Sequence, residues 1–575
     1  MRRLRTFALP AALTAASLAV WAGGTALAAE APSGSAAVLA AGPAAGQALA
    51  ANAADHDDPA DHVWNGADVR TVALTGSGAT TTAPGVAISG STVTVTSAGT
   101  YQLSGSLTNG RIVVNSTGAG IVRLILNGVT LASTTGAPID VVAAAEVMIV
   151  LADGTTNRVS DAATHSATDP ANAALYSAAN LTITGNGTLV VTGNAFDGIA
   201  STDGLVVDSG TINVTAVDDG IRGKDYLVMQ GGAVTVNASG DGLKSDHDTD
   251  ATRGYISLAG GTATVTAAGD AVTAETDVIV SGGSLTTRSG GGSTVTPGET
   301  STKGLKAGVA VVISDGQTTV DASDDGVHSD ATVTVDGGTT VVASGDDGVH
   351  AEGILAVSAG SVTVSRSYEG LEGLKVLISG GSVTATATDD AVNAAEAGLP
   401  DRQIAPNATI AISGGTVVVS GGTDGLDSNG TLSVSGGVVV VAGSSTSARG
   451  EGGLDASGAL TITGGTILST GLTASTSPLP TAGQGVVSYL FGANRPAGTV
   501  VHLATSSGTQ IASFQSTRVF RGVVFSSSQI SRGTSYVIYT GGSVSGTAVG
   551  GGLYTGGTLS GTRVAAVTAG PAVRG

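Results

Sequence analysis

Apolar and polar residues alternate along the middle of the chain in a pattern that repeats about every 22 residues. An acidic residue followed by glycine marks each repeat, and the first of these anchor residues stand at positions 197, 219 and 241. A fixed period of this size is typical of a solenoid, in which each unit buries its apolar face against its neighbours. The alternation within a unit has a period of two, which predicts strands rather than helices.

When the units are aligned on the anchor, two positions hold the same kind of residue in every unit. The second position after the anchor is always apolar: Ile199, Ile221, Leu243, Val272, Leu305, Val327, Val349, Leu371, Val392, Leu426 and Leu454. The fourth position is always small: Ser201, Gly223, Ser245, Ala274, Ala307, Ser329, Ala351, Gly373, Ala394, Ser428 and Ala456. The third position, between them, is mostly polar or charged and is predicted to point outward. The glycine after the anchor is interpreted as a place where the backbone bends.

A Gly-Gly pair followed by a β-branched run, as in 337–342, marks a further strand in each unit. One unit therefore holds about three short strands with their turns. Units of this kind stacked in parallel form a β-helix, with coils about 4.8 Å apart. The fold predicted from the sequence is an all-β solenoid whose equivalent residues form straight ladders.

The first residues read as an export signal. Residues 1–29 combine a basic start, an apolar run and a small-residue cleavage pattern at Ala26-Leu27-Ala28, which predicts a secretory signal peptide. A single membrane anchor is the alternative, although the apolar run is short and contains Pro10. No later stretch is long enough to span a bilayer, so the protein is predicted to be secreted or attached to the cell surface. Residues 30–66 are Ala-rich and are interpreted as a linker.

Strand patterns cover most of the remaining chain. Residues 67–190 lack the strict repeat and are predicted to form irregular N-terminal β coils, and residues 191–471 are predicted to form the regular parallel β-helix. Residues 485–541 hold seven of the fifteen Phe and Tyr residues. They are predicted to form a small β subdomain that caps the C-terminal end, because an uncovered end would expose a sheet edge to pairing. Residues 542–575, rich in Gly, Ser and Thr, are predicted to be a flexible tail.

Charge and composition exclude several function classes. The net charge is −20, and nucleic-acid binding needs a basic face, so nucleic acid is an unsuitable partner. The chain has no cysteine, which excludes disulfides, thiol catalysis and thiolate zinc sites. Neither a Gly-x-Ser-x-Gly elbow nor a His-Glu-x-x-His motif is present. A non-catalytic binding protein that acts as a monomer is favoured, and an enzyme remains an alternative.

The third positions and the anchors form two parallel rows of charge. The third positions are Arg222, Lys244, Thr273, Lys306, His328, His350, Glu372, Asn393 and Asp427. The anchors are Asp219, Asp241, Asp270, Lys303, Asp325, Asp347, Glu369, Asp390 and Asp424. Such a stripe would bind an acidic polysaccharide. Lys and Arg would bind its carboxylates directly, and Ca²⁺ would bridge the carboxylates of the protein and the polymer. The alternative is that Asp-Gly is turn chemistry and that neighbouring charges neutralise one another.

The candidate ligand-binding residues are Arg222, Lys224, Lys244, Lys303, Lys306, His328 and His350. The candidate calcium ligands are Asp218, Asp219, Asp225, Asp241, Asp246, Asp248 and Asp250. The alternating carboxylates of 246–250 resemble the start of a calcium loop, but the glycine and glutamate of an EF-hand are not at their spacings, and a solvated loop is the alternative. His328 and His350 occupy one position on adjacent coils, which suits either a zinc pair or ordinary surface residues.

Two other functions remain open. Arg222 or Lys244 beside bound calcium would be placed to act as the base of a uronate lyase, which removes a proton next to a carboxylate. Alternatively, the protein would be a structural rod or adhesin whose charged stripe only keeps it in solution.

Several motifs resemble a bacterial carbohydrate-binding β-helix family that binds polygalacturonic acid and cellulose. They are 213–225, 240–246 and 302–307, with 126–129, 136–139 and 151–155 earlier in the chain. The resemblance extends over roughly residues 85–541. It implies a right-handed parallel β-helix with bound calcium, similar in overall shape to pectate lyases, and a non-catalytic, pectin-type ligand.

The charged polymer is favoured over cellulose among the ligands that the resemblance implies. Flat neutral glucans need aromatic platforms. The coil region offers few aromatic side chains beyond Tyr226, Tyr255 and Tyr368. An acidic, polygalacturonate-like polysaccharide is therefore the expected partner.

Overall fold

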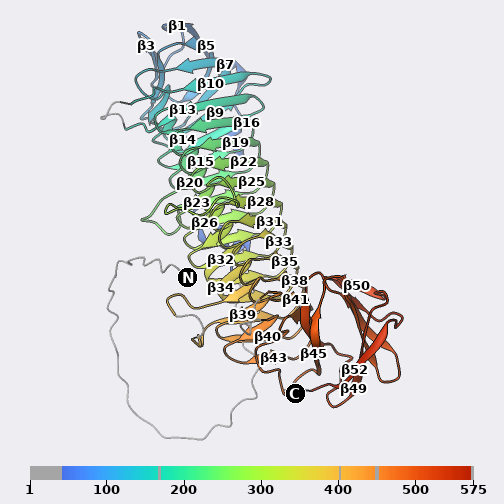
Figure 1. Cartoon of the computed structure of the whole chain (residues 1–575). Coiled ribbons are helices and arrows are strands. Elements are labelled where there is room, and N and C mark those ends of the chain that lie inside the picture. Colours follow the sequence, from blue (N-terminus) through green and yellow to red (C-terminus); the bar gives the residue numbers. More distant parts are fainter. Residues whose placement is uncertain (1–41, 166–169, 400–402, 447–451, 571–575) are drawn as a thin grey trace, which may run out of the picture. The chain divides into compact units, whose positions relative to one another are not determined.

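Short strands follow one another along almost the whole chain, and most of them pair in parallel with the strand two or three further on (Figure 1). The computed structural model describes residues 42–165, 170–399, 403–446 and 452–570. The described chain is nearly all β, with one long, mostly parallel sheet. This pairing is compatible with the β-helix predicted from the repeat. The predicted signal peptide at 1–29 lies outside the described residues.

Three columns of strands result from this pairing. The first contains the anchor motifs: β8 (Ile139–Ala143), β11 (Ala173–Ser177), β14 (Asp197–Ser201), β17 (Ile221–Gly223), β20 (Leu243–Ser245), β23 (Val272–Ala274), β26 (Leu305–Ala307), β29 (Val327–Ser329), β32 (Val349–Val357), β34 (Leu371–Ile378), β36 (Val392–Ala394), β39 (Leu426–Ser428) and β42 (Leu454–Ala456). We call this the track column. β32 and β34 are long enough to pair in the second column as well.

The second column follows the track column in each coil: β9 (Glu146–Leu151), β12 (Leu181–Gly185), β15 (Gly204–Val207), β18 (Tyr226–Met229), β21 (Tyr255–Leu258), β24 (Asp277–Val280), β27 (Ala310–Ile313), β30 (Thr332–Val335), β37 (Thr409–Ile412), β40 (Thr431–Val434) and β43 (Leu460–Ile462). The third column follows the Gly-Gly turns: β10 (Thr156–Ser160), β13 (Thr188–Gly193), β16 (Thr211–Ala216), β19 (Ala233–Ala238), β22 (Thr262–Ala267), β25 (Ser284–Ser289), β28 (Gln317–Ala322), β31 (Thr339–Ser344), β33 (Ser361–Arg366), β35 (Ser382–Thr386), β38 (Thr416–Ser420), β41 (Val438–Ala442) and β44 (Thr466–Gly471).

The core lies inside the coils and is filled by the predicted apolar column. Its members Ile221, Leu305 and Leu371 are at most 1 % exposed. The fourth position is small because the chain turns there. At Gly223, for example, a Cβ would collide with the carbonyl of Tyr226.

Two glycine positions shape each coil for different reasons. The second glycine of the Gly-Gly turn has a positive φ, as at Gly338 (φ +64°), where L side chains are disfavoured. The glycine after the anchor does not supply the conformational freedom that was predicted, because Gly220 is not in the positive-φ region. It is needed for space, since a Cβ there would collide with the Val236 side chain and the carbonyl of Gly242 in the next coil.

Antiparallel pairs interrupt the parallel pattern at the N-terminal end. The first strands are β1 (Arg70–Gly76), β2 (Ala79–Thr80), β3 (Val86–Ser89), β4 (Thr92–Val95), β5 (Gly99–Leu107), β6 (Arg111–Asn115) and β7 (Ile121–Ala132). β1 pairs with β2 and β3 pairs with β4 in antiparallel fashion, whereas β5 and β7 are parallel. These antiparallel pairs make the first strands less regular than the later columns.

The predicted linker packs against the solenoid over the part that the structure describes. Residues 42–68, which we call the strap, contain α1 (Ala45–Ala51) and the 3-10 turns η1 (Pro59–His62) and η2 (Gly66–Asp68). Ala45 and Ala48 pack on a cluster formed by β24 and β27, and Trp64 packs on a cluster around Met148. The linker interpretation is corrected here, because the outer face of the second column is apolar and the strap covers it.

Further strands end the solenoid: β45 (Val486–Arg495), β46 (Val500–Thr505), β47 (Gln510–Gln515), β48 (Phe520–Ser526), β49 (Ser535–Thr540), β50 (Thr547–Gly550), β51 (Leu553–Thr555) and β52 (Thr562–Thr568). β48 pairs antiparallel with β44 and β45, which covers the last edge of the third column. The predicted flexible tail is corrected over residues 547–568, because β51 pairs with β47 and β52 pairs with β49. The described residues contain no helix long and apolar enough to cross a membrane.

Candidate ligand-binding track

The third-position residues of successive coils are direct partners in the sheet. They form one register line: Arg222, Lys244, Thr273, Lys306, His328, His350, Glu372, Asn393, Asp427 and Asp455. We call this line the track. Neighbouring members are one strand spacing apart, about 4.8 Å. The predicted alignment is therefore present, and the track changes from basic residues through imidazoles to mostly acidic residues along the chain.

Most anchor carboxylates are buried, and they form a ladder beside the track. The backbone N–H groups of Asp219, Asp241 and Asp270 each donate to Oδ1 of the preceding anchor at 2.8–3.2 Å. The same bond recurs further on, from Glu369 to Asp347 at 3.2 Å. These N–H groups lie at a turn inside the stack and need an acceptor, which the carboxylate supplies. The anchors are thus structural first, rather than an outward row of oxygen ligands.

The cations of the track are half-buried and already contact carboxylates. Arg222 pairs with Asp246 at 2.9 Å. Lys244 Nζ lies 2.9 Å from both Asp219 and Asp241. Lys306 Nζ lies 3.4 Å from Asp270 and is the most exposed of the three, with 36 % of its side chain accessible.

Two predicted ligand residues lie off the track. Lys303 occupies an anchor position, where its side chain is buried between Asp324 and Asp325. The ion pairs with these carboxylates outweigh the effect of burial and raise the pKa of Lys303 to about 12. Lys224 follows β17 directly, outside the register line, and its backbone N–H donates to Ser201.

The predicted calcium ligands do not converge on one point. Asp225 contacts His247 and Arg253, and Asp250 lies 3.4 Å from Arg253. Asp246 and Asp241 contact Arg222 and Lys244 as described above, while Asp248 is exposed in the loop. Most of the predicted calcium ligands thus already contact cationic side chains.

A smaller carboxylate group contains two of the predicted calcium ligands. Asp218 and Asp219 join Asp197, with one oxygen from each within 4.8 Å of the others. Burial, followed by the charges of Asp219 and Asp218, raises the pKa of Asp197 to about 7. Asp197 was not among the predicted metal ligands, although it is the first anchor of the same 22-residue period.

The two track histidines differ in their contacts. Their ring centroids are 5.0 Å apart, and the rings are nearly perpendicular. His328 is hydrogen bonded to Asp325 at 2.9 Å and to Asp330 at 3.1 Å. Burial lowers the pKa of His328, but these two bonds more than offset it and raise the pKa to about 8.

Carboxylates collect around His350. Its Nδ1 atom lies 3.6 Å from Asp347, 3.8 Å from Asp325 and 4.0 Å from Glu372. Burial and the charges of Glu372 and Glu369 raise the pKa of Asp347 well above its ordinary value. At the neighbouring anchor Asp325, burial is outweighed by Lys303 and the histidines, and the pKa is lowered. The sequence did not identify Glu372 as a site residue.

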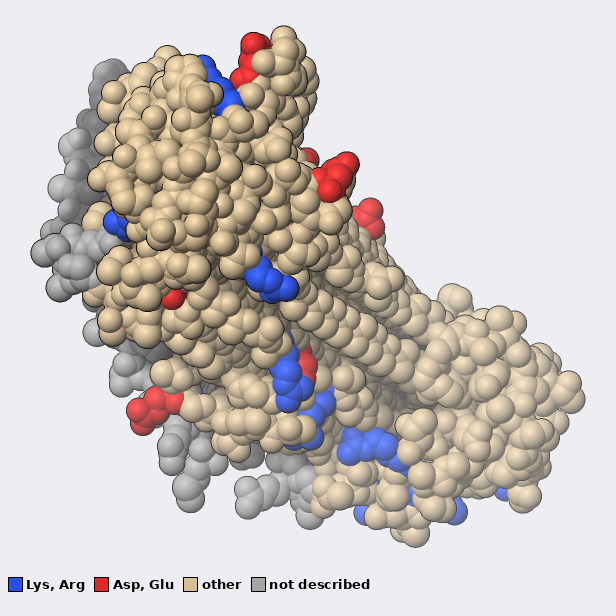
Figure 2. All heavy atoms as spheres, turned by 90° about the horizontal axis from the view of Figure 1, so that it is seen from above, with Lys and Arg blue, Asp and Glu red and all other residues tan. Residues whose placement is uncertain are grey.

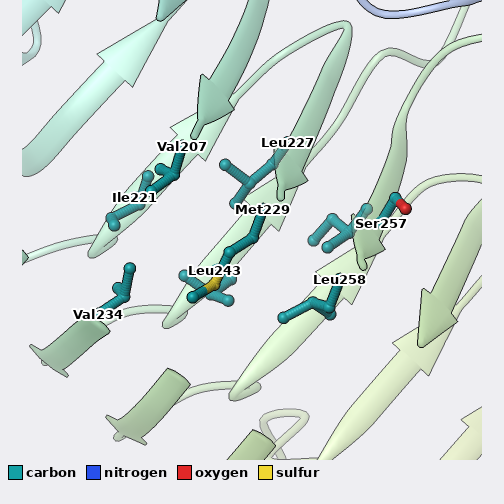
Figure 3. A pocket seen from close by; sticks show the side chains of 9 residues that line it. Val207, Ile221, Leu227, Met229, Val234, Leu243, Ser257 and Leu258 are labelled. Atoms are coloured by element: carbon teal, nitrogen blue, oxygen red, sulfur yellow. The ribbon is translucent and has the colours of Figure 1, made fainter. Parts of the chain in front are cut away.

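A cavity inside the coils is not a ligand site. Figure 3 shows its lining of aliphatic side chains, among them Val207, Leu227 and Leu243, which point toward one another from successive coils. An apolar cavity of this kind stays dry and only reflects imperfect packing. Figure 2 shows a mostly uncharged face on which several Lys and Arg side chains lie near one another, some with Asp or Glu beside them.

Comparisons with known proteins identify the family of the chain through one family model. No curated protein matches the chain. A solved structure, described as the polysaccharide lyase-like protein from C. thermocellum in a gadolinium derivative, is 29 % identical over 42 % of this chain and 96 % of that chain, with a TM-score of 0.40. The model of a family described as carbohydrate-binding domain-containing protein matches residues 89–348 and 346–475, which is more than half of the chain. The chain therefore belongs to this family of carbohydrate-binding domain-containing proteins.

Proposed function

We propose that the chain binds an acidic, polygalacturonate-like polysaccharide along the track, with Ca²⁺ assisting, and does not cleave it. The proposal places the protein outside the cell, as a monomer, and takes the solenoid to be the right-handed parallel β-helix that the sequence resemblance implies. Membership of a carbohydrate-binding family supports a polysaccharide partner.

The main support for the proposal is the register of the track. Arg222, Lys244 and Lys306 stand on one line with His328 and His350, so cationic or ionisable groups recur along a straight path. An extended polyuronate carries one carboxylate per sugar and advances by a similar step. A ligand carboxylate would compete for the exposed side of each cation. The anchor carboxylate would meanwhile keep its Oδ1 bond to the backbone.

Calcium is included because the protein and the proposed ligand are both anionic. The net charge is −20, and the later part of the track carries Glu372, Asp427 and Asp455. A divalent cation between two carboxylates removes this repulsion. The group Asp197, Asp218 and Asp219 suits a hard cation, because it offers only oxygen atoms close together.

The tyrosines favour the charged polymer over cellulose. Tyr226 and Tyr255 stack at 5.4 Å, but both are almost fully buried. The strap covers them, since His56 is hydrogen bonded to Tyr226, and Tyr255 donates to the carbonyl of Ala53. These two rings do not offer the flat platform that a neutral glucan needs. Of Tyr226, Tyr255 and Tyr368, only Tyr368 is exposed, at 42 %, and one ring is a small platform.

Binding without cleavage is supported by the state of the two candidate lyase bases. Hydrogen bonds to Asp241 and Asp219 outweigh burial and raise the pKa of Lys244. Similarly, Asp246 outweighs burial at Arg222 and raises its pKa. Both side chains therefore hold their protons more tightly than usual, which makes them poor proton acceptors.

Retention on polygalacturonate gels tests the proposal. The double variant Lys244→Ala/Lys306→Ala should lose at least about tenfold in affinity, because two carboxylate contacts on the track are removed. Chelation of calcium should weaken the wild type as well. Arg288→Ala is the matched control, because Arg288 is an exposed cation paired with Asp321 outside the register line of the track.

Other outcomes separate the remaining functions. If the double variant and the chelated wild type are retained as strongly as the untreated protein, the stripe has no part in binding and the structural-rod alternative stands. An unsaturated product absorbing in the ultraviolet, formed from polygalacturonate with calcium present, would show a lyase instead.

A further inference from the structure

Among the described track residues, His350 has a half-buried imidazole with no hydrogen bond to its ring. Three carboxylates face its Nδ1 atom, and Glu352 lies 3.9 Å from its Nε2 atom. Its side chain is 19 % exposed, and its Nδ1 atom faces oxygens of Asp325, Asp347 and Glu372 at 3.6–4.0 Å. These distances are too long for hydrogen bonds. In a tetrahedral site with metal–ligand distances of about 2.1 Å, two neighbouring ligand atoms are about 3.4 Å apart. The distances from Nδ1 of His350 to the carboxylate oxygens are slightly longer than this.

Two of the three carboxylates turn one oxygen toward His350, and their side chains also contact each other through a hydrogen bond. Asp347 accepts the Glu369 N–H with Oδ1 at 3.2 Å, which leaves Oδ2 toward His350. Glu372 accepts Asn393 Nδ2 with Oε1 at 3.4 Å, which leaves Oε2 toward His350. Within the described residues, no Lys or Arg lies within ion-pair distance of either carboxylate. Neighbouring groups thus orient both side chains while one oxygen of each points at the same imidazole.

Asp325, the third carboxylate, is already satisfied. Its Oδ2 atom is bound by His328 at 2.9 Å and by the ammonium of Lys303. His328 in turn uses its second nitrogen on Asp330. The predicted zinc pair of His328 and His350 is therefore not the set that the structure favours.

We propose that Asp347, His350 and Glu372 bind a divalent first-row transition metal ion, of which Zn²⁺ is the best match. The imidazole distinguishes this site from a calcium site, because Ca²⁺ takes oxygen ligands only. Three protein ligands suit zinc with an open fourth position. Asp347 and His350 lie at either end of one anchor turn, and Glu372 is the register partner of His350 in the next coil. The site is separate from the calcium ligands proposed above.

Titration of the full chain with metal salts tests the site. With calcium present in millimolar excess, ZnCl₂ followed by calorimetry should give one strong site per chain. CoCl₂ should give visible absorption bands of a low-coordinate Co²⁺ site, which Zn²⁺ then displaces. Glu372→Gln and His350→Gln should each weaken Zn²⁺ binding at least tenfold, since each removes a ligand.

His328→Gln is the matched control, because it changes the other track imidazole but no proposed ligand. Its Zn²⁺ affinity should stay within about threefold of the wild type. The proposal is overturned if the wild type binds neither metal, if calcium displaces Zn²⁺, or if His328→Gln loses binding while Glu372→Gln keeps it. Thermal unfolding measurements show whether each variant is folded. If His350→Gln does not fold, the nearly isosteric variant Glu372→Gln alone tests whether the site binds Zn²⁺.

Discussion

At the scale of single residues, the acidic anchors explain most of the repeat. An aspartate at the corner of each coil gives one oxygen to the N–H of the next corner and leaves the other for a side chain. Lys303 breaks this column, and its ammonium is held between Asp324 and Asp325 instead. The ion pair is buried, so removing one partner leaves an uncompensated charge in the stack.

Lys303→Ala should lower the free energy of unfolding by about 3 kcal/mol, because Asp324 and Asp325 would lose their cation in a buried setting. Urea denaturation followed by circular dichroism measures the change. Lys306→Ala is the control, since its ion pair with Asp270 is longer and more exposed and should contribute less than about 1 kcal/mol. Equal losses in the two variants would mean that burial at Lys303 has no special effect.

At the scale of elements, each coil depends on a tight turn before the third column. The glycine at the second position of this turn recurs with positive φ from coil to coil, although Asp315 and Ala359 replace the first glycine in two coils. These glycines are Gly232, Gly261, Gly283, Gly316, Gly338, Gly360, Gly381, Gly415, Gly437 and Gly465. The turns stack on one another, and at Gly338 a Cβ would come within 2.8 Å of the Asp315 carbonyl carbon. Conformation and space therefore both require glycine.

Gly338→Ala should destabilise the protein by about 2 kcal/mol, from the left-handed backbone and the close carbonyl together. The midpoint of thermal unfolding measures the effect. Gly492→Ala serves as the control, because nothing lies within 4 Å of a Cβ there and its φ is not positive. A Gly338→Ala variant as stable as the control would show that the turn can relax.

At the scale of the whole molecule, the structure covers surfaces that the coils alone would leave open. The strap lies on the apolar outer face of the second column, and β48 pairs along the last strand of the third column. Covering these surfaces prevents the edge pairing and apolar exposure that solenoids would otherwise suffer. The strap also brings Asp57 and Asp61 close to Glu146 of β9.

This contact gives a dependence of stability on pH. Burial, followed by the charges of Asp61 and Asp57, raises the pKa of Glu146 from 4.5 to about 7, and its Oε1 atom is buried without a hydrogen bond. The folded state then binds the proton more tightly than the unfolded state. The free energy of unfolding should therefore fall as the pH rises from about 4.5 to about 7.

Glu146→Gln should remove this fall, because glutamine stays neutral. The variant should match the wild type near pH 4 and exceed it at pH 8 by on the order of 1 kcal/mol, since solvent screens a half-buried carboxylate. Denaturation at both pH values measures the difference. Glu352→Gln, an exposed carboxylate on β32, is the control. A Glu146→Gln variant that gains no stability at pH 8 would contradict the assignment.

The sequence predicted the columns of the fold well, because they depend on local spacing. Ile221 and Leu243 are two members of one buried column, and Arg222 and Lys244 are register partners. The candidate site was predicted less completely. Asp197 and Glu372 were missed as site residues, and Asp225 and Asp246 turned out to contact cationic side chains. A period shows which residues stack, but it does not show which charges meet.

The sequence by itself determined that strands stack in parallel and which residues share a line, since a repeat of fixed length leaves one register that buries every apolar position. Only the tertiary structure decided the rest: that the anchor carboxylates turn inward to backbone N–H groups, that the N-terminal segment lies on the second column, and that residues 547–568 complete a sheet. These outcomes depend on side-chain directions at turns and on contacts between distant segments, which no local pattern encodes.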